Sequence, residues 1–258
     1  MKKNIAILLL FAILLALVAT QRHMDMVPVN LMDKLAPISM HHIMGTDILG
    51  RDISELMLVG CLRSFLVVII AGTISLSVGV TVGILTGYFQ GNISMLLQFV
   101  TDFLLIIPTF IVALLVTAVF GLHPVSAGIA LGLCQMGHFA NHAAALTKEI
   151  KKKEYISILH IMGYSRPRIL IRHILPIVLP LVFPYFGSMA SSNILQYASL
   201  AFIGLGSDIT KPDWGTMLYQ YRVYIVNEPL LIIWPSLGIF LMAIIFQFLF
   251  DTRKVETS

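Results

Sequence analysis

Near the middle of the chain, residues 154–176 read EYISILHIMGYSRPRILIRHILP. With Lys148 and Lys151 to Lys153 just before them, they form a polar and basic island in an otherwise apolar sequence. Charged side chains are costly in the bilayer core and need contact with water. The island is therefore predicted to lie between two membrane spans, at a water-facing end of the molecule.

The composition is that of a membrane protein. Hydrophobic residues make up 58% of the 258 residues, charged residues only 12%, and the mean hydropathy is +0.91. Ordinary soluble domains carry roughly 25% charged residues, so the chain is not expected to be a soluble monomer. The net charge of +4 is small and favours a role in membrane orientation over nucleic-acid binding. Cys61 and Cys134 have no CxxC spacing, which indicates buried free thiols.

The apolar runs predict an all-helical membrane protein with about six spans of roughly 20 residues. The first run is interpreted as an uncleaved span, because no small-x-small cleavage site follows it. In the second run, Gly79, Gly83 and Gly87 share one helical face, where small residues let two backbones approach closely. The expected spans are residues 5–19, 64–87, 95–120 (with Pro108 inside), 125–146, 174–197 and 229–250. Two regions follow: residues 1–63, with the first span and an extracellular segment, and residues 64–258, with the five remaining spans.

Basic residues are divided unevenly between the two sides of this arrangement. Of the 17 Lys and Arg residues, most fall on the side that carries both chain termini and the loop at about residues 147–173. The positive-inside rule places that side in the cytoplasm. We therefore expect a multi-pass membrane protein with both termini and this loop in the cytoplasm.

The loop has its own local pattern. Residues 148–162 suit a short helix, and Gly163 suits the left-handed position that ends one. Ser165 suits the N-cap of a second helix, with Pro167 tolerated in the first turn. Leu175-Pro176 marks the return to the membrane. Two short helices joined by a glycine make a knob that can fit a partner's groove, whereas charge alone would favour a merely solvated loop.

Five fragments in a fixed order along the chain together resemble a known family. They are Gly45–Asp52 (Gly-Thr-Asp-x-Leu-Gly-Arg-Asp), Arg63-Ser64, Asp102 with Pro108, the loop from Glu154 to Pro176, and Phe202–Gly206 with Trp214-Gly215. The chain thereby resembles the dipeptide, oligopeptide and nickel permeases of ATP-binding-cassette (ABC) importers, in particular their second-subunit, C-type members. The resemblance implies the type I permease fold and a coupling loop on which an ATPase subunit docks. The docking residues that it implies are Glu154, Tyr155, Ser157, Ile158, Leu159, Gly163, Ser165, Arg172, Leu175 and Pro176.

The chain departs from the family pattern at several places. Ser157-Ile158-Leu159 stands where Glu-Ala-Ala is usual, so the docking face is expected to be bulkier and less acidic. Ile177 replaces the Asn that usually follows Leu-Pro, and Asn141-His142 replaces an arginine-rich stretch. These changes bear on the fit to a partner and leave the expected fold intact.

The resemblance also implies a set of partners. The chain contains no Gly-Lys-Ser or Gly-Lys-Thr and so has no P-loop to hold phosphates. We expect it to be a transport subunit and not an enzyme, with ATP and Mg²⁺ used by two separate ATPase subunits. The other implied partners are a homologous second permease, an extracellular or periplasmic solute-binding protein and the lipid of a bacterial inner membrane.

Polar residues within the predicted spans are candidates for the translocation path. Asp102 is the only acid placed within an apolar span, and both snorkelling near the span's cytoplasmic end and a role on the path fit it. Asn193, Gln196 and Tyr197 form a second polar segment that suits the path.

Histidines raise the question of a metal. His138 and His142 share a helical face and are weak candidates for metal ligands. We expect them instead to bond across helices or to line a wet cavity. No cofactor is expected on this chain.

The cargo is the least determined feature. Peptide-importing members usually carry Glu five residues before the Phe of the Phe-x-Gly-Leu-Gly segment, where this chain has Tyr197. Pro229-Leu230 and Trp234-Pro235 are more similar to nickel-type members. Nickel or a metal chelate is therefore the favoured cargo, with dipeptides or oligopeptides as the alternative. A standalone channel or secondary transporter would need no docking loop, and the motifs of a membrane-embedded enzyme are missing from the sequence.

Overall fold

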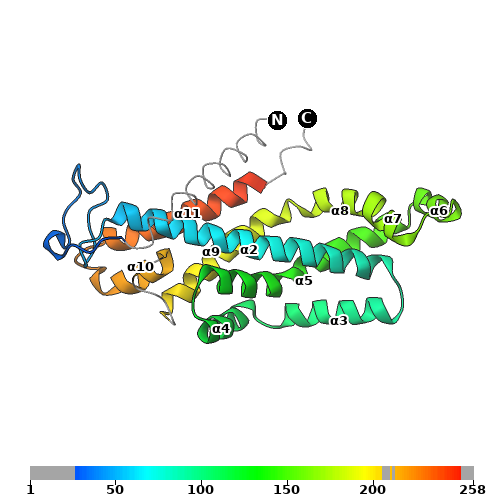
Figure 1. Cartoon of the computed structure of the whole chain (residues 1–258), viewed down its shortest axis with the longest axis horizontal. Helices are drawn as coiled ribbons and strands as arrows, with labels where there is room; N and C mark the ends of the chain where they lie inside the picture. Colours follow the sequence, from blue (N-terminus) through cyan, green and yellow to red (C-terminus); the bar gives the residue numbers. More distant parts are fainter. Residues whose placement is uncertain (1–26, 205–209, 211–212, 251–258) are drawn as a thin grey trace.

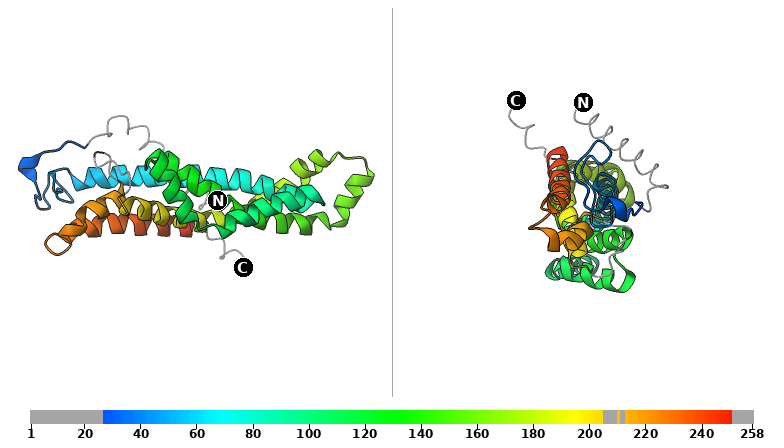
Figure 2. Two further views of the ribbon diagram at one scale, coloured as in Figure 1. Left: turned by 90° about the horizontal axis from the view of Figure 1, so that it is seen from below. Right: turned by 90° about the vertical axis from the view of Figure 1, so that its left-hand side faces the viewer.

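A computed structural model describes residues 27–204, 210 and 213–250. The predicted first span, residues 5–19, lies outside these residues. The described part is an elongated bundle of helices without strands, and Figures 1 and 2 show its long helices running nearly along one axis. This confirms the all-helical fold class.

Two long helices, α2 (Ile53–Tyr88) and α5 (Pro124–Lys151), form the spine of the bundle. The predicted glycine face is confirmed, because Gly79, Gly83 and Gly87 all lie against the backbone of α5. A side chain on Gly83 would overlap the carbonyl oxygen of Ala140. Small residues at four-residue spacing thus bring the two helices into close contact along much of their length.

The start of α2 corrects the predicted span. The helix begins at Ile53 and not at Ser64, because Asp52 caps it: its carboxylate accepts a hydrogen bond from the Ser54 backbone N–H at 2.7 Å. An N-cap carboxylate satisfies a backbone donor that would otherwise be unpaired. The helix therefore starts before the apolar run, and hydropathy alone could not show this extension.

The predicted span at residues 95–120 is two helices, not one. These are α3 (Asn92–Ile106) and α4 (Thr109–Phe120), bent by 83° at their junction. Pro108 lacks an N–H and disfavours helical geometry at the residue before it, and Ile107 is indeed extended. Pro108 therefore divides the predicted span into two helices.

The segment that follows α5 folds back in several short pieces. The predicted helix at residues 148–162 is divided, because α5 ends at Lys151 and α6 (Glu154–Ile161) starts a new direction. The chain then forms α7 (Arg166–Ile169), a π-helical turn (Leu170–Ile174) and α8 (Leu175–Val182). A 52° bend separates this run from α9 (Tyr185–Phe202), so the predicted span at 174–197 is also broken.

The remaining elements close the opposite end. They are a short 3-10 turn (Leu31–Asp33), α10 (Trp214–Tyr221), a second 3-10 turn (Arg222–Tyr224) and α11 (Leu230–Phe250). The segment before α2 and the helix α10 lie together at the end opposite α6 and α7 (Figure 1). We call these the α10 end and the α6 end.

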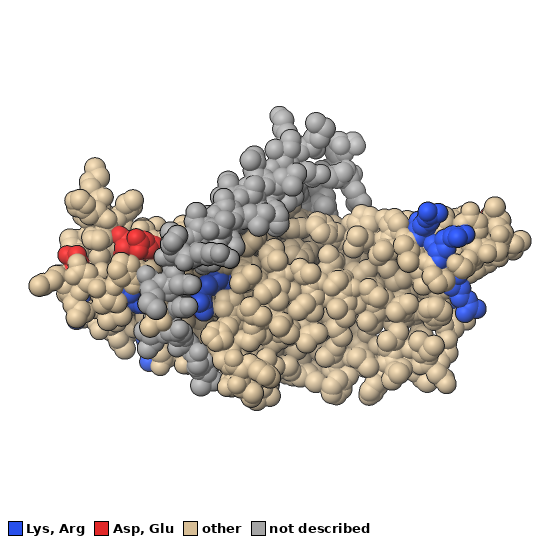
Figure 3. Space-filling view, viewed as in Figure 1, with Lys and Arg blue, Asp and Glu red and all other residues tan. Residues whose placement is uncertain are grey.

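Several of these helices have the length and composition of membrane spans. Within the described residues, α2 and α11 are each long and apolar enough to cross a membrane, and the two bent pairs raise the number to four if each pair is one span. The predicted span at 125–146 lies in α5, which is long but carries many polar and small residues. In Figure 3, Lys and Arg are visible at both ends, including a group at the α6 end, while the visible Asp and Glu lie at the α10 end.

Candidate functional site

At the α6 end, Gly163 joins α6 to α7, and we call these two short helices and their glycine the knob. The Gly163 N–H donates to the His160 carbonyl at 3.0 Å, and the Tyr164 N–H donates to the Leu159 carbonyl at 3.1 Å. Gly163 has φ of +80°, which confirms its predicted left-handed conformation. This double hydrogen bond is the Schellman ending of a helix. Ser165 occupies the predicted N-cap position of α7, but its side chain makes no capping hydrogen bond.

The inner face of the knob is held by apolar contact and one tyrosine. Ile156, Ile169 and Ile174 are buried in a cluster that also contains Tyr88, at the end of α2. The Lys151 ammonium donates to the Tyr88 carbonyl at 2.7 Å, and the Tyr88 hydroxyl lies 3.1 Å from His160 Nε2. Tyr88 therefore ties α2, α5 and α6 together. Sequence reasoning missed it, because a tyrosine at the end of an apolar run carries no special signal.

The outer face of the knob is apolar at its tip and basic at its sides. Ile158, Ile161 and Met162 are exposed, and the Ile161 side chain is 85% exposed. Arg166 and Arg168 are exposed beside them. Exposed apolar patches rimmed by polar residues are typical of protein interaction sites. Of the ten predicted docking residues, Leu159 and Leu175 are half-buried, and the other eight are exposed: Glu154, Tyr155, Ser157, Ile158, Gly163, Ser165, Arg172 and Pro176.

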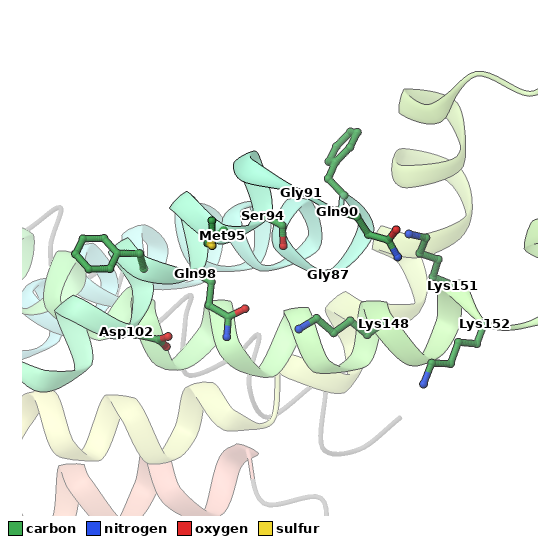
Figure 4. A pocket seen from close by; sticks show the side chains of 12 residues that line it. Gly87, Gln90, Gly91, Ser94, Met95, Gln98, Asp102, Lys148, Lys151 and Lys152 are labelled. Atoms are coloured by element: carbon green, nitrogen blue, oxygen red, sulfur yellow. The ribbon is translucent and has the colours of Figure 1, made fainter.

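A cleft of about 820 Å³ opens beside the knob, between the end of α2, α3 and α5. Gln98 and Asp102 extend into it from α3, and Lys148 extends into it from α5 (Figure 4). Asp102 is half-buried there. The structure therefore places this predicted path residue on the wall of the cleft, on the side that faces Lys148 of α5.

The α10 end holds a buried ion pair. Asp47 and Arg51 are 0% and 2% exposed, and the Arg51 guanidinium lies 2.6 Å from the Asp47 carboxylate. The Tyr221 hydroxyl donates to the same carboxylate at 3.0 Å, which fastens α10 to the segment before α2. Burial, and then the charge of Asp47, raise the pKa of Tyr221 well above its usual value, so this hydroxyl keeps its proton. The Gly45–Asp52 motif thus supplies the carboxylate that holds α10 against the segment before α2.

A second buried contact involves two of the predicted path residues. The Tyr197 hydroxyl donates to Asp213 at 2.8 Å, and Asp213 also caps α10 by accepting from the Thr216 N–H at 2.9 Å. Tyr197 and Asn193 are buried, while Gln196 is half-buried and bonded to Ser192. Asp213 was missed from the sequence, although an Asp just before Trp214 and three residues before Thr216 is an N-cap pattern.

The two candidate histidines are not part of a metal cluster in the described residues, where no group of three or more His, Cys, Asp or Glu side chains could hold an ion. His138 and His142 are both exposed on α5. The His142 ring stacks on Tyr185 of α9, with the ring centroids 6.3 Å apart.

A comparison with protein families matches residues 79–252 to the "Binding-protein-dependent transport system inner membrane component" family. The chain belongs to this family. The permease is 33% identical over 210 residues to the "Glutathione transport system permease protein GsiD" of Pectobacterium atrosepticum, covering 81% of this chain and 70% of the relative. The protein of the same name from Escherichia coli O6:K15:H31 is 33% identical over 213 residues, covering 83% and 70%.

Among solved structures, the permease resembles a chain of the MetNI methionine ABC transporter in inward-facing conformations. The TM-score is 0.57 at 16% identity, covering 76% of this chain and 93% of that chain. This likeness concerns the fold. Together with the family match it confirms the type I ABC importer permease fold expected from the sequence.

Proposed function

We propose that this permease forms half of the translocation path of an importer of short peptides, and that ATPase subunits drive it by docking on the knob of α6, Gly163 and α7. A homologous second permease would supply the other half of the path, and an external solute-binding protein would deliver the cargo. Membership of an ABC importer permease family is established by the comparisons; the cargo and the docking are our proposal.

The observation that carries the docking proposal is the two-faced knob. Its inner face, with Ile156, is buried against the bundle, while its tip, with Ile161 and Met162, is apolar and exposed. Exposed isoleucine and methionine at a water-facing end favour association with another protein. The basic side chains Arg166 and Arg168 favour an acidic rim on the partner's groove.

The cargo proposal replaces the expectation of nickel. The relatives are named as glutathione transport permeases, and glutathione is a tripeptide. Nickel was favoured partly because Tyr197 stands where peptide importers usually carry Glu, but the Tyr197 hydroxyl donates to a carboxylate, that of Asp213, at 2.8 Å. Tyr197 is also buried and does not reach a surface that cargo could contact in this arrangement. Short peptides are therefore the better supported cargo.

Docking can be tested by placing a charge on the tip of the knob. Ile161→Glu should prevent co-purification of co-expressed ATPase subunits, because burying a carboxylate in an apolar groove is unfavourable. Val226→Glu is a matched control, since Val226 is 88% exposed and Ile161 85%, but Val226 lies near α10. Equal co-purification with both variants would contradict docking at the knob.

The cargo can be tested by uptake in cells that lack the gene. We expect the deletion to reduce uptake of glutathione, of a labelled dipeptide, or of both, and to leave the cellular nickel content unchanged. Complementation with the wild-type gene should restore the peptide uptake. Loss of nickel under metal limitation with normal peptide uptake would return the cargo assignment to nickel.

The proposed docking requires the α6 end to face the cytoplasm. Cysteines at Lys152 and Met32, in a background without Cys61 and Cys134, should react from opposite sides of the membrane. An impermeant reagent added to intact cells should reach position 32 and not position 152. Reaction at position 152 from outside would reverse the orientation.

A further inference from the structure

The half of α5 next to the α6 end exposes a face with no large apolar residue. The exposed residues of α5 between positions 138 and 151 are His138, Asn141, His142, Ala145, Lys148 and Glu149. Their spacing of three and four residues places them on one side of the helix. Phe139 and Ile150 in the same stretch are buried, so the helix has a distinct apolar face turned inward.

The exposed face of α3 differs. It carries Ile93, Leu96, Val100 and Phe103, which is the composition expected for contact with lipid chains. A helix face with His138, Asn141 and Lys148 would be strongly unfavourable in the same surroundings. The polar face of α5 therefore belongs against water or protein.

This face leads directly into the cleft beside the knob. Lys148 lines the cleft from α5, and Gln98 and Asp102 line it from α3 (Figure 4). Lys151 also lines the cleft, but its ammonium is already bonded to the Tyr88 carbonyl. Among the described residues, Lys148, Lys152 and Asp102 line the cleft without a hydrogen-bond or ion-pair partner, so the cleft offers two cations on the α5 side and one anion on the α3 side.

We propose that the polar face of α5 and this cleft form one wall of the aqueous path by which cargo leaves toward the cytoplasm, with Lys148 and Asp102 receiving the two charged ends of a peptide. This rests on the proposed function as an importer of short peptides. A free peptide carries a carboxylate, which complements Lys148, and an ammonium group, which complements Asp102.

An anionic lipid headgroup is the main competing occupant of the cleft, because lysines at the cytoplasmic surface attract such lipids. A headgroup would account for Lys148 and Lys152. It would not account for a polar face that continues to His138, about 15 Å further along the helix. The water-filled path accounts for both parts of the face.

Water access can be tested by cysteine labelling in the assembled importer, reconstituted without Cys61 and Cys134. An impermeant methanethiosulfonate should modify His138→Cys and Asn141→Cys about tenfold faster or more than Leu133→Cys, because the reactive thiolate forms in water. Leu133 is the matched control, since it is an exposed apolar residue of the same helix. Equal rates at the three positions would overturn the proposed aqueous wall.

The role of Lys148 can be tested by uptake of glutathione and of a labelled dipeptide into proteoliposomes. Lys148→Glu should lower uptake about tenfold or more, whereas Lys148→Arg should stay near the wild type, because the effect depends on the sign of the charge. ATP hydrolysis stimulated by the loaded binding protein should persist in Lys148→Glu, which a merely misfolded or undocked variant would lose. Wild-type uptake by Lys148→Glu would overturn the assignment.

The same variants separate the competing explanations. If Lys148→Glu and wild type transport equally in neutral phosphatidylcholine vesicles and differ only in anionic vesicles, Lys148 binds lipid and the cargo role is wrong. The labelling experiment requires no cargo. A wild-type importer that carries no peptide would therefore defeat the proposed cargo, while labelling would still decide whether this face meets water.

Discussion

The two ends of the permease are stabilised by different kinds of interaction. At the α10 end, Asp47, Arg51, Tyr221 and Asp213 are buried and bonded to one another or to backbone groups. At the α6 end, the knob is supported by buried isoleucines, and its tip remains exposed. A buried ion pair tolerates one geometry, because a charge left alone in the interior is very unfavourable. Apolar support is less directional, so it suits the end at which we propose that a partner docks.

The largest effect is expected from breaking the ion pair at the α10 end. Asp47→Ala leaves the Arg51 guanidinium buried without its carboxylate and should destabilise the fold by about 3–5 kcal/mol. Thermal unfolding in detergent would measure this loss. The double variant Asp47→Ala with Arg51→Met should lose less than the sum of the single changes, because no unpaired charge remains. Strict additivity would show that the pair does not fasten this end.

The next effect concerns the spine that connects the two ends. Gly83→Leu would force α2 away from Ala140 and Ala143 of α5 and should destabilise the bundle by about 1–3 kcal/mol, as overpacking does. Thr81→Leu, on the exposed side of α2, is the matched control. Unfolding midpoints of the two variants give the comparison. If both variants match the wild type, the close contact of the spine contributes little.

A smaller and more local effect is expected at the turn of the knob. Gly163→Val places a β-branched residue at φ of +80° and should cost about 1–2 kcal/mol, confined to the α6 end. We expect membrane insertion to persist and uptake to be uncoupled from ATP hydrolysis. Gly163→Asn should retain more coupling, since Asn tolerates this conformation. Normal uptake by the valine variant would show that the turn is dispensable.

The smallest effect is a pH dependence at the α10 end. Burial would raise the pKa of Asp52, but hydrogen bonds from Ser54 and His42 prevail and lower it. A carboxylate with a lowered folded pKa stabilises the protein above its usual pKa, and this contribution is lost as the pH falls through the folded value. Asp52→Asn keeps an N-cap side chain and should reduce this acid dependence by about 0.5 kcal/mol or less. Unfolding midpoints at neutral and acidic pH would measure it, and an unchanged pH profile would contradict the role of Asp52.

The features that the sequence predicted correctly are those set by local chemistry. Gly163 adopted its left-handed conformation, and the glycine face of α2 met a neighbouring helix as its spacing indicated. Pro108 lay at a break, although hydropathy suggested a continuous span. Family membership followed from short motifs that occur in a fixed order along the chain.

The features that it missed depend on residues far apart in the chain. Asp47 and Tyr221 meet across 174 positions, and Tyr197 meets Asp213 only because α10 folds back onto α9. The contact of Tyr197 with Asp213 could not be predicted, since no pattern within α9 shows which residues cover this tyrosine. Likewise, the polar face of α5 could be read from the sequence, but the cleft that it enters requires the position of α3.

The continuity of α2 has a mechanical consequence. This single helix is about 54 Å long and contains no proline. At one end the carbonyl of Tyr88 holds Lys151 beside the knob, and at the other the carbonyl of Met57 accepts the indole N–H of Trp214 in α10 at 3.1 Å. Because α5 packs along the glycine face of α2, α2 is stiffened along much of its length. A tilt of the knob would therefore be carried to α10 along one unbroken helix, whereas bends at Pro108 and before Tyr185 separate α4 and α9 from the helices that precede them.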